Sequence, residues 1–534
     1  MKTVILFLAC LFTQLSVWAQ AKVEQIPRII EKNGRHALLI DGKPFLILGG
    51  QAHNSSAWPG MMPSVWAGIK QLHANTLEVP LYWEQIEPQQ GKFNFSIVDT
   101  LLAQARARQV RLVFLWFATW KNGSNHYMPQ WMKADAAKYP NIHNRKGNPI
   151  DSPSPHAEAT LNADIKAFTA VMSYLKKADP QHTVIMVQVE NEPGSWDSIR
   201  DYAPDAQKLF EGQVPAELLK PAILTALNVP VITSGTWQKV FGGRADEYFQ
   251  AWSISRFIGK VAAAGKAVYP LPLYVNAALR DPLSNPSAPS YESGGPTDNV
   301  IQIWKAAAPA IDILAPDIYL SGSERALKVL ELYDRPDNAL FVPEAGFIKD
   351  NAKYLYNVIA RGGIGFSPFG IDYNAEDPAT DEAKERYLPY AHAYAAIAPM
   401  MRELAQWGFE GKVQTVVEHE DQAEQTIDLG QWKATVTFGS GRGGTQKNVV
   451  ANGKAMIVKL SPNKFVLMGT HSHIAFTPAG NQAGKAWQYL KVEEGKYQNG
   501  VFKPIRILNG DETDWGGPSF GETPSVVQCE LIIR

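Results

Sequence analysis

Eight short runs of almost continuously apolar residues alternate with helical patterns, and this alternation constrains the fold more than any other feature. Strands buried on both faces of a parallel sheet have this continuous apolar character, whereas half-exposed strands alternate. Eight such strands with helices between them predict an α/β fold, the (β/α)8 TIM barrel. We assign a further apolar run, 229–233, to the connection after the fourth strand. The eight runs cover residues 44–51, 76–83, 110–117, 183–192, 271–278, 311–319, 339–346 and 363–372.

The hydrophobic pattern of the sequence changes late in the chain. A long helical stretch follows the eighth run, and after it come short alternating runs separated by turns rich in glycine, asparagine and proline. Such alternation is typical of an all-β fold. Near the start, Asp41-Gly42 lies between two apolar runs, which indicates a hairpin. We therefore expect a barrel with an N-terminal hairpin over residues 20–410 and a smaller β-sandwich over residues 411–534.

The first residues have the pattern of a secretory signal peptide. Lys2 precedes an apolar stretch, and the sequence Val-Trp-Ala at 17–19 ends in a small residue suited to cleavage. We expect a signal peptide over residues 1–19 and an exported protein, periplasmic or secreted. Cys10 leaves a lipoprotein open as the alternative to soluble export. No later segment has 18 consecutive apolar residues, so we expect no membrane span.

Charge and composition narrow the possible partners. The chain has 51 Lys and Arg against 52 Asp and Glu, a formal net charge of −1. Nucleic-acid-binding domains carry a basic excess, so we expect no nucleic acid partner. The 15 Trp, 19 Tyr and 22 Phe suit a neutral, ring-shaped ligand, but a large core also needs many aromatic residues. The oligomeric state stays open at this point.

Three short motifs resemble binding signatures but fit ordinary structure better. The sequence GSGRGG at 439–444 lacks the Lys-Ser/Thr ending of a phosphate loop, so we interpret it as a flexible hairpin. His471 and His473 have no third ligand nearby, so we interpret them as solvated strand histidines. The acidic residues do not have the spacing of a calcium loop. We therefore expect neither a metal nor a cofactor.

Two of the eight runs end in carboxylates. The fourth leads into Val-Gln-Val-Glu-Asn-Glu-Pro-Gly at 187–194, and the seventh ends in Phe-Val-Pro-Glu-Ala-Gly at 341–346. Residues at the C-terminal ends of barrel strands face the active site. Alternation along a strand places Glu190 and Glu192 on one face. Glu192 and Glu344, facing each other across a barrel mouth, suit glycoside hydrolysis, in which one carboxyl group donates a proton and the other attacks.

These motifs, together with RHALLIDGKPFLILGGQ at 35–51 and NTLEVPLYWEQIEPQQGKFNF at 75–95, resemble family 35 of the glycoside hydrolases. Members of this family are β-galactosidases with catalytic glutamates on the fourth and seventh barrel strands. The look-alikes are secreted bacterial enzymes that act on plant hemicellulose side chains, including xyloglucan. The third strand differs from the common pattern, because LWFATWKNG at 115–123 is more similar to the family 42 β-galactosidases.

The resemblance implies a role for several residues. Glu192 would be the general acid/base and Glu344 the nucleophile, and the reaction would retain the anomeric configuration. Asn191 would bind the sugar 2-hydroxyl, and Tyr319 would donate a hydrogen bond to the nucleophile. Other strand ends offer further candidates for binding the sugar, namely Gln51, Tyr82, Trp116, Lys121 and Asn276.

We therefore expect a retaining exo-β-galactosidase that removes terminal β-D-galactose from oligosaccharides, in particular xyloglucan side chains. One alternative keeps the mechanism but changes the sugar to a β-glucoside or an arabinoside. Another is a non-catalytic carbohydrate-binding protein, against which the presence of both Glu192 and Glu344 argues. The exact glycan, its aglycone and the role of the β-domain are left open by the sequence.

Overall fold

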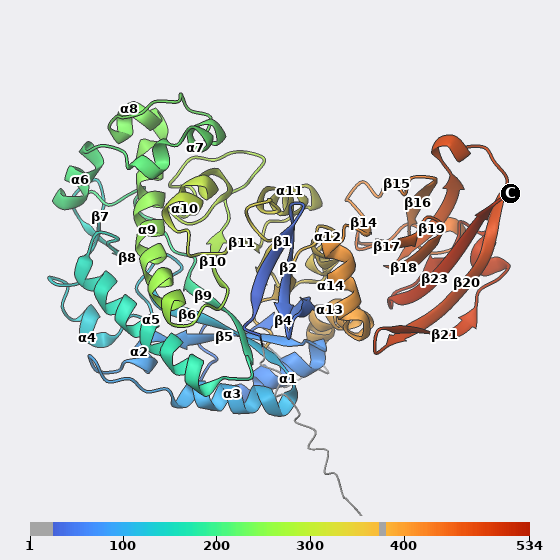
Figure 1. The fold of residues 1–534 in the computed structure, drawn as a ribbon, viewed down its shortest axis with the longest axis horizontal. Helices are drawn as coiled ribbons and strands as arrows, with labels where there is room; N and C mark the ends of the chain where they lie inside the picture. The colour runs from blue at the N-terminus through green and yellow to red at the C-terminus, as the bar shows by residue number, and fades with distance from the viewer. Residues whose placement is uncertain (1–24, 373–380) are drawn as a thin grey trace, which may run out of the picture.

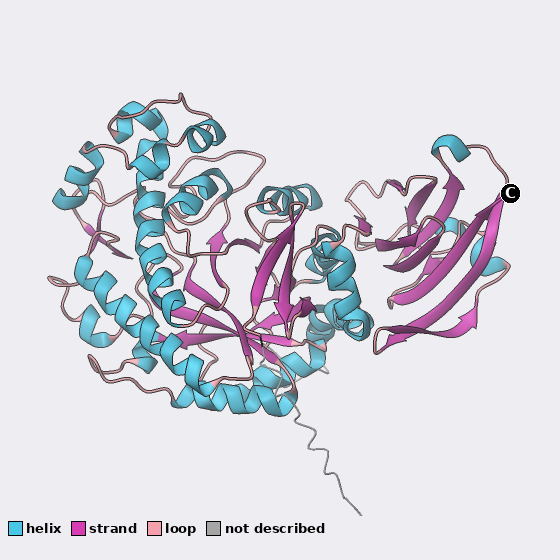
Figure 2. Ribbon diagram, in the orientation of Figure 1, coloured by secondary structure: helices cyan, strands magenta, loops and turns pink. Residues whose placement is uncertain are grey.

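The computed structural model describes residues 25–372 and 381–534 (Figure 1). Eight parallel strands close into a barrel surrounded by helices, and antiparallel sheets make up the C-terminal region (Figure 2). The predicted (β/α)8 barrel and all-β region are both confirmed. The predicted signal peptide at 1–19 lies outside the described residues. Within the described ranges, no helix combines the length and the apolar character that crossing a membrane requires.

Each of the eight apolar runs forms one barrel strand. Neighbouring strands in the closed barrel follow the order of the chain, as in a TIM barrel. Apart from β6, which extends past its apolar run, the strands lie within the predicted runs. The barrel strands are β4 (Ile47–Gln51), β5 (Thr76–Tyr82), β6 (Arg111–Lys121), β9 (Val184–Asn191), β10 (Leu273–Ala278), β11 (Ile313–Ile318), β12 (Phe341–Ala345) and β13 (Gly365–Pro368).

A helix follows each barrel strand and covers the outside of the barrel (Figure 1). The layer is tight: a Cβ at Gly265 would lie 2.3 Å from the ring of Phe168 on the neighbouring helix. The covering helices are α1 (Met62–Leu72), α3 (Ser96–Arg108), α5 (Glu158–Ala178), α9 (Ala245–Val268), α10 (Ile301–Ala307), α11 (Ser323–Tyr333), α12 (Tyr354–Ala360) and α13 (Asp381–Ile397).

Several connections carry elements of their own. Residues 229–233 form no strand and lie in the long connection between β9 and α9, as assigned from the sequence. That connection contains α6 (Pro204–Glu211), α7 (Pro221–Ala226) and α8 (Trp237–Phe241). Earlier connections contain α2 (Trp83–Ile86), α4 (Gln130–Lys133), β7 (Asn141–His143) and β8 (Pro149–Pro153).

The predicted N-terminal hairpin is confirmed and has an additional strand. β1 (Arg28–Lys32), β2 (Arg35–Ile40) and β3 (Lys43–Phe45) form an antiparallel sheet. Asp41 and Gly42 both have positive φ, 56° and 74°, which a two-residue hairpin turn of this kind requires. The hairpin packs against α14 (Met401–Phe409), the last helix before the β-region.

The C-terminal region consists of a six-stranded and a four-stranded sheet. Apolar side chains from both sheets form one core, in which the rings of Phe465 and Phe476 lie 5.3 Å apart. The larger sheet has the order β14 (Val413–Val417), β17 (Lys454–Ser461), β18 (Lys464–Thr470), β23 (Ser525–Ile533), β20 (Trp487–Gln498) and β21 (Val501–Ile507). The smaller has the order β15 (Gln425–Asp428), β16 (Trp432–Phe438), β19 (Ser472–Pro478) and β22 (Ser519–Phe520).

The inner strands of the six-stranded sheet are buried on both faces, whereas the edge strand β21 is largely exposed. In β17, Ala455 and Ile457 belong to the core between the two sheets. Met456 and Val458, which alternate with them, belong to the core of the barrel domain. On β20, the ring of Tyr497 packs edge-on against Trp407 of α14 at 5.9 Å. The sheet is therefore part of two cores and joins the β-region to the barrel.

The predictions for the two short motifs of the β-region have different outcomes. Residues 439–444 lie in a loop closed by an antiparallel bridge between Ser440 and Gln446, as a local hairpin requires. The prediction of solvated strand histidines is wrong. His473 is buried within β19, and His471 lies half-buried in the turn before it. The alternating pattern of polar and apolar residues in this segment does not show that its polar face is covered in the folded protein.

We predict that Gly365→Ala destabilises the barrel at the junction of its last and first strands. A Cβ at this position would lie 2.4 Å from Cβ of Ile47 in β4. Overpacking of this kind costs about 1–3 kcal/mol, which chemical denaturation would measure. Gly60→Ala is the matched control, because a Cβ there has no heavy atom within 4 Å. Equal stability of the two variants would contradict this account of the barrel junction.

Candidate active site

Two hydrogen bonds hold the carboxylate of Glu344 at the end of β12. The hydroxyl of Tyr319 donates to Oε1 at 2.6 Å, and Nε2 of Gln51 donates to Oε2 at 2.8 Å. Hydrogen bonds to an ionised group are among the strongest in proteins, so this pair fixes the orientation of the carboxylate. The structure thus brings together three residues that the sequence placed at three different strand ends.

Glu192 faces Glu344 from the residue directly after β9. One carboxyl oxygen of each lies within 4.8 Å of the other. Burial raises the pKa of Glu192 to about 7, and the charge of Glu344 contributes to this increase, whereas Lys121 opposes it. The backbone N–H of Glu192 donates to Oδ1 of Asn276 at 2.9 Å. Near neutral pH, Glu192 can therefore be either a proton donor or a proton acceptor.

Asp317 is a third carboxyl group in the same cluster, and sequence reasoning missed it. It lies in β11, and Nδ2 of Asn276 donates to its Oδ2 at 2.7 Å. Burial raises the pKa of Asp317 well above its usual range, and the charges of Glu344 and Glu192 add to the effect. A carboxylate at a strand end, two residues before Tyr319, was a signal that could have found it.

The cluster also has the arrangement of a possible cation site. Among the described residues, Glu192, Asp317 and Glu344 are the one group of three carboxylate, histidine or cysteine side chains placed to share an ion. Carboxylate oxygens are ligands for Mg²⁺ or Ca²⁺. The charges of neighbouring carboxyl groups contribute to the raised pKa values of Glu192 and Asp317. Either a proton or a bound cation would offset this repulsion.

Glu190 does not share a face with Glu192, so that prediction is wrong. Both residues have positive φ, 65° and 43°, which breaks the alternation of side chains along the strand. Glu190 instead accepts a hydrogen bond from the backbone N–H of Trp120 at 2.7 Å. It lies beside Asp164 of α5, in the wall of the barrel. Residues held in this uncommon conformation cluster at functional sites.

Trp116 is not brought to the carboxylates either. Its indole N–H donates to Oδ1 of Asp164 on α5 at 3.0 Å, and its ring packs against Phe168 of the same helix. It therefore lies between β6 and the helix layer, where a substrate does not reach. The run around Trp116 is apolar throughout, so the sequence does not show which residues of the strand face the barrel interior.

Tyr82 supports the rim of the barrel. Its hydroxyl accepts a hydrogen bond from the N–H of Ala57 at 3.0 Å, and its ring stacks on Tyr127 at 4.9 Å. The exposed ring of Trp58 lies over it at 6.0 Å. Tyr82 itself is fully buried, so Trp58 rather than Tyr82 presents an aromatic face to a ligand at this rim.

Several buried polar atoms at the strand ends have no hydrogen-bond partner among the described residues. They include both amide atoms of Asn191 and Oε1 of Gln51. Such groups cost free energy unless a ligand or water satisfies them. Lys121 is buried nearby, with its ammonium group 5.3 Å from the ring of Phe117. The unpartnered atoms surround the carboxyl cluster and are available to the hydroxyl groups of a ligand.

Glu292 is a fourth buried carboxyl group, and it lies in the connection after β10. Two glycines leave room for it: a Cβ would lie 2.3 Å from its Oε1 at Gly123 and 2.4 Å from its Cγ at Gly194. Burial raises the pKa of Glu292 well above its usual range, and the charge of Glu192 adds to the effect. Because this residue belongs to no strand or periodic segment, no pattern in the sequence marked it.

Comparisons with known sequences show which proteins parts of this chain are similar to. Residues 62–228 match the family described as "Beta-galactosidase", family 42 of the glycoside hydrolases. Beta-galactosidase 11 of Arabidopsis thaliana is 30% identical over 163 residues, which are 29% of this chain and 18% of that protein. Beta-galactosidase of Xanthomonas manihotis is 27% identical over 203 residues, 37% of this chain and 31% of that protein. The matches thus span less than a third of either relative.

Residues 390–517 match a domain of unknown function, DUF5597. This match begins within α13 and ends before the last strand. Among solved structures, the β-galactosidase from Bacillus circulans sp. alkalophilus has a TM-score of 0.49 at 15% identity, covering 67% of this chain and 57% of that one. The catalytic domain of the β-amylase from Paenibacillus polymyxa has a TM-score of 0.47 at 14% identity, covering 64% and 96%.

The sequence of the barrel is thus similar to the glycoside hydrolases over residues 62–228. Within that class, its sequence is similar to the β-galactosidases, which confirms the resemblance drawn from the motifs. The family 42 match includes the third strand, the segment that departs from the family 35 pattern.

We predict that Glu344→Gln lowers the pKa of Glu192 below about 7, because the charge of Glu344 contributes to raising it. The pKa should still stay above the usual value of about 4.3, since burial is the largest cause and is unchanged. Titration of ¹³C-labelled glutamate carboxyl groups by NMR would measure both values.

The control for this titration is Glu324→Gln, which removes one negative charge from an exposed position on α11. It should leave the titration of Glu192 unchanged. A pKa of Glu192 that stays at its wild-type value or rises in Glu344→Gln would contradict the proximity of the two groups.

Proposed function

We propose that the protein is a retaining exo-β-galactosidase that hydrolyses terminal, non-reducing β-D-galactose from oligosaccharides. The observation that carries the proposal is that two carboxyl groups in different environments face each other. Glu344 is held by two hydrogen-bond donors, and Glu192 faces it with a pKa raised to about 7. The relatives named as β-galactosidases support the choice of sugar.

In the proposed first step, Glu344 attacks the anomeric carbon while Glu192 protonates the departing glycosidic oxygen. The carboxylate of Glu344 becomes a glycosyl ester, and the leaving group departs as an alcohol. Tyr319 and Gln51 keep the attacking carboxylate oriented during this step. Glu192 ends the step as a carboxylate and is then able to accept a proton.

In the proposed second step, Glu192 removes a proton from water, and the resulting oxygen nucleophile attacks the anomeric carbon. The ester bond to Glu344 breaks, and galactose leaves with its original anomeric configuration. Enzymes of this kind have carboxyl groups about 5–5.5 Å apart, whereas inverting enzymes need about 6.5–9.5 Å. Carboxyl oxygens within 4.8 Å of each other support the retaining alternative.

The unpartnered polar atoms around the cluster support binding of a hydroxylated ring. The amide of Asn191, next to Glu192, is placed to bond the sugar 2-hydroxyl, an interaction that strengthens in the transition state. The exposed ring of Trp58 offers a face on which a sugar could stack at the rim. The resemblance of the motifs to secreted enzymes of hemicellulose breakdown favours xyloglucan side chains as the substrate and an exported location for the protein.

Separate variants of the two glutamates test the roles. We expect Glu344→Gln to abolish turnover of every galactoside. Glu192→Gln should lower hydrolysis of galactosyl disaccharides by about 10²–10⁴-fold, the usual contribution of an acid/base group. Dinitrophenyl galactoside should be much less affected, because its leaving group needs little protonation. Wild-type turnover in Glu344→Gln, with the fold intact by circular dichroism, would refute the assignment.

A panel of glycosides tests the sugar. We expect the wild-type protein to release product from aryl β-galactoside in preference to aryl β-glucoside or α-L-arabinoside. With galactosylated xyloglucan oligosaccharides, the released sugar should be galactose, and NMR should show its β-anomer first. Preference for glucoside or arabinoside would favour the alternative sugars. Binding in calorimetry without turnover of any glycoside would favour a non-catalytic protein.

We predict that Tyr319→Phe lowers kcat by about ten- to a hundredfold. The change removes the 2.6 Å hydrogen bond to Glu344, and a bond to a charged group contributes about 1.5–3 kcal/mol. Steady-state kinetics on aryl β-galactoside would measure the loss. Tyr174→Phe removes a comparable bond to Asp99 on the barrel surface and should leave kcat unchanged. Equal effects of the two changes would contradict a role for Tyr319 at the nucleophile.

A further inference from the structure

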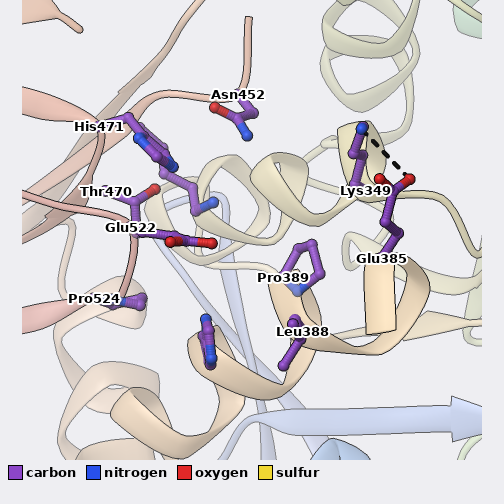
Figure 3. Close-up of a pocket in the computed structure, with 11 residues that line it drawn as sticks. Lys349, Glu385, Leu388, Pro389, Asn452, Thr470, His471, Glu522 and Pro524 are labelled. Atoms are coloured by element: carbon purple, nitrogen blue, oxygen red, sulfur yellow. Dashed lines mark ion pairs between the residues drawn. The ribbon is translucent and has the colours of Figure 1, made fainter. Parts of the chain in front are cut away.

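A second cavity, far along the chain from Glu192, lies between the barrel domain and the β-region (Figure 3). Its volume is about 540 Å³, within the range of small-molecule sites. One wall comes from α13 and the segment after β12, and the other from the strands of the six-stranded sheet and their connections (Figure 3). The residues that line it are Lys349, Glu385, Leu388, Pro389, His392, Asn452, Lys454, Thr470, His471, Glu522 and Pro524.

Lys454 is the most unusual residue of this cavity. The residue is only 6% exposed, yet no hydrogen bond or ion pair joins its ammonium group to a residue in the described ranges. The nearest interaction is with the ring of Tyr356, at 5.6 Å. Thr470 is its register partner on β18, and the buried hydroxyl of Thr470 also lacks a partner there. The buried hydroxyl of Thr470 and the ammonium group of Lys454, which both line the cavity, are thus left for a ligand.

The charges around the cavity do not satisfy Lys454. Lys349 and Glu385 pair with each other at 3.6 Å on the wall formed by the barrel domain (Figure 3). Lys353 lies close to Lys454 but donates to backbone carbonyls, including that of Glu418 at 2.9 Å. Burial lowers the pKa of Lys454 to about 8, and the charge of Lys353 contributes to this effect, so Lys454 still carries a proton at neutral pH. A buried ammonium group without a carboxylate partner is costly, and an anionic ligand would offset that cost.

The remaining lining residues limit the kind of anion. Glu522 and Glu385 contribute carboxylates, which repel a phosphate dianion but accept hydrogen bonds from hydroxyl groups. Asn452, His471 and the hydroxyl of Thr470 can bond further hydroxyl groups. Leu388, Pro389 and Pro524 add apolar contacts. This combination fits a ligand with one negative charge and several hydroxyl groups.

We propose that this cavity binds an acidic sugar, a hexuronate, with its carboxylate on Lys454 and Thr470 and its hydroxyl groups toward Asn452, His471 and Glu522. His471, one of the two histidines first interpreted as solvated, is part of this site. The site is separate from the carboxyl cluster and does not take part in the proposed hydrolysis. It would hold an acidic residue of a glycan on the protein, independently of the galactosidase activity.

Calorimetry with D-galacturonate and D-galactose tests the proposal, because the two sugars differ only in the carboxylate. We expect the wild-type protein to bind D-galacturonate with a Kd of about 1 mM or tighter. Lys454→Met, which keeps the length of the side chain and its apolar contacts, should weaken binding at least tenfold. Lys485→Met, at an exposed position outside the cavity, should bind as the wild type does. Thr470→Val is a second variant that weakens binding without removing a charge.

Several outcomes of the binding measurements would overturn the proposal. Tighter binding of inorganic phosphate than of D-galacturonate would show a simple anion site. Equal loss of D-galactose and D-galacturonate binding in Lys454→Met would show a neutral sugar site, and absence of binding by every probe would show no site. Each measurement is repeated in Glu344→Gln. Retained D-galacturonate binding there separates the cavity from the active site, whereas loss of binding would place the ligand at Glu344.

Discussion

The candidate active site depends on how the protein places several buried carboxyl groups in one barrel mouth. Burial of one charge is costly, and burial of several like charges side by side costs more. The structure provides two donors for Glu344 and leaves Glu192 and Asp317 with raised pKa values. One group is therefore suited to attack and another to proton transfer. The chemical difference between two identical side chains arises from burial, neighbouring charges and hydrogen-bond partners, and not from their sequence motifs.

The barrel accounts for the way these groups meet. Gln51, Asp317, Tyr319 and Glu344 come from the ends of three strands that are neighbours or near-neighbours in the closed sheet. Each strand end is fixed by a fully buried run, so the side chains rest on rigid elements. Glu192 differs, because it follows β9 in a left-handed conformation that turns it away from Glu190. The position of the proposed acid is thus determined by a local backbone feature.

Much of this arrangement could be predicted because buried parallel strands and strand-end carboxylates leave clear patterns. The eight runs and the hairpin at Asp41-Gly42 were accessible from the residues, and the pairing of Glu344 with Tyr319 was implied by the family resemblance. An apolar run without alternation does not show which of its residues face the barrel interior, so the outward orientation of Trp116 could not be predicted. Glu292 lies in a connection that has no periodic sequence pattern. Two glycines that are distant from it in the sequence leave room for its side chain. The burial of His473 depends on which face of a sheet is covered, a property of the assembled fold.

The six-stranded sheet, whose inner strands contribute to two cores, has a consequence for the engineering of this chain. Met456 and Val458 complete the core of the barrel domain, while their neighbours complete a different core. A domain that shares its interior in this way is not a detachable appendage. Truncation after the last barrel helix would leave an apolar surface open to water and to other chains. Transplanting the barrel into another protein would therefore require carrying this sheet with it, or redesigning the helices that it covers.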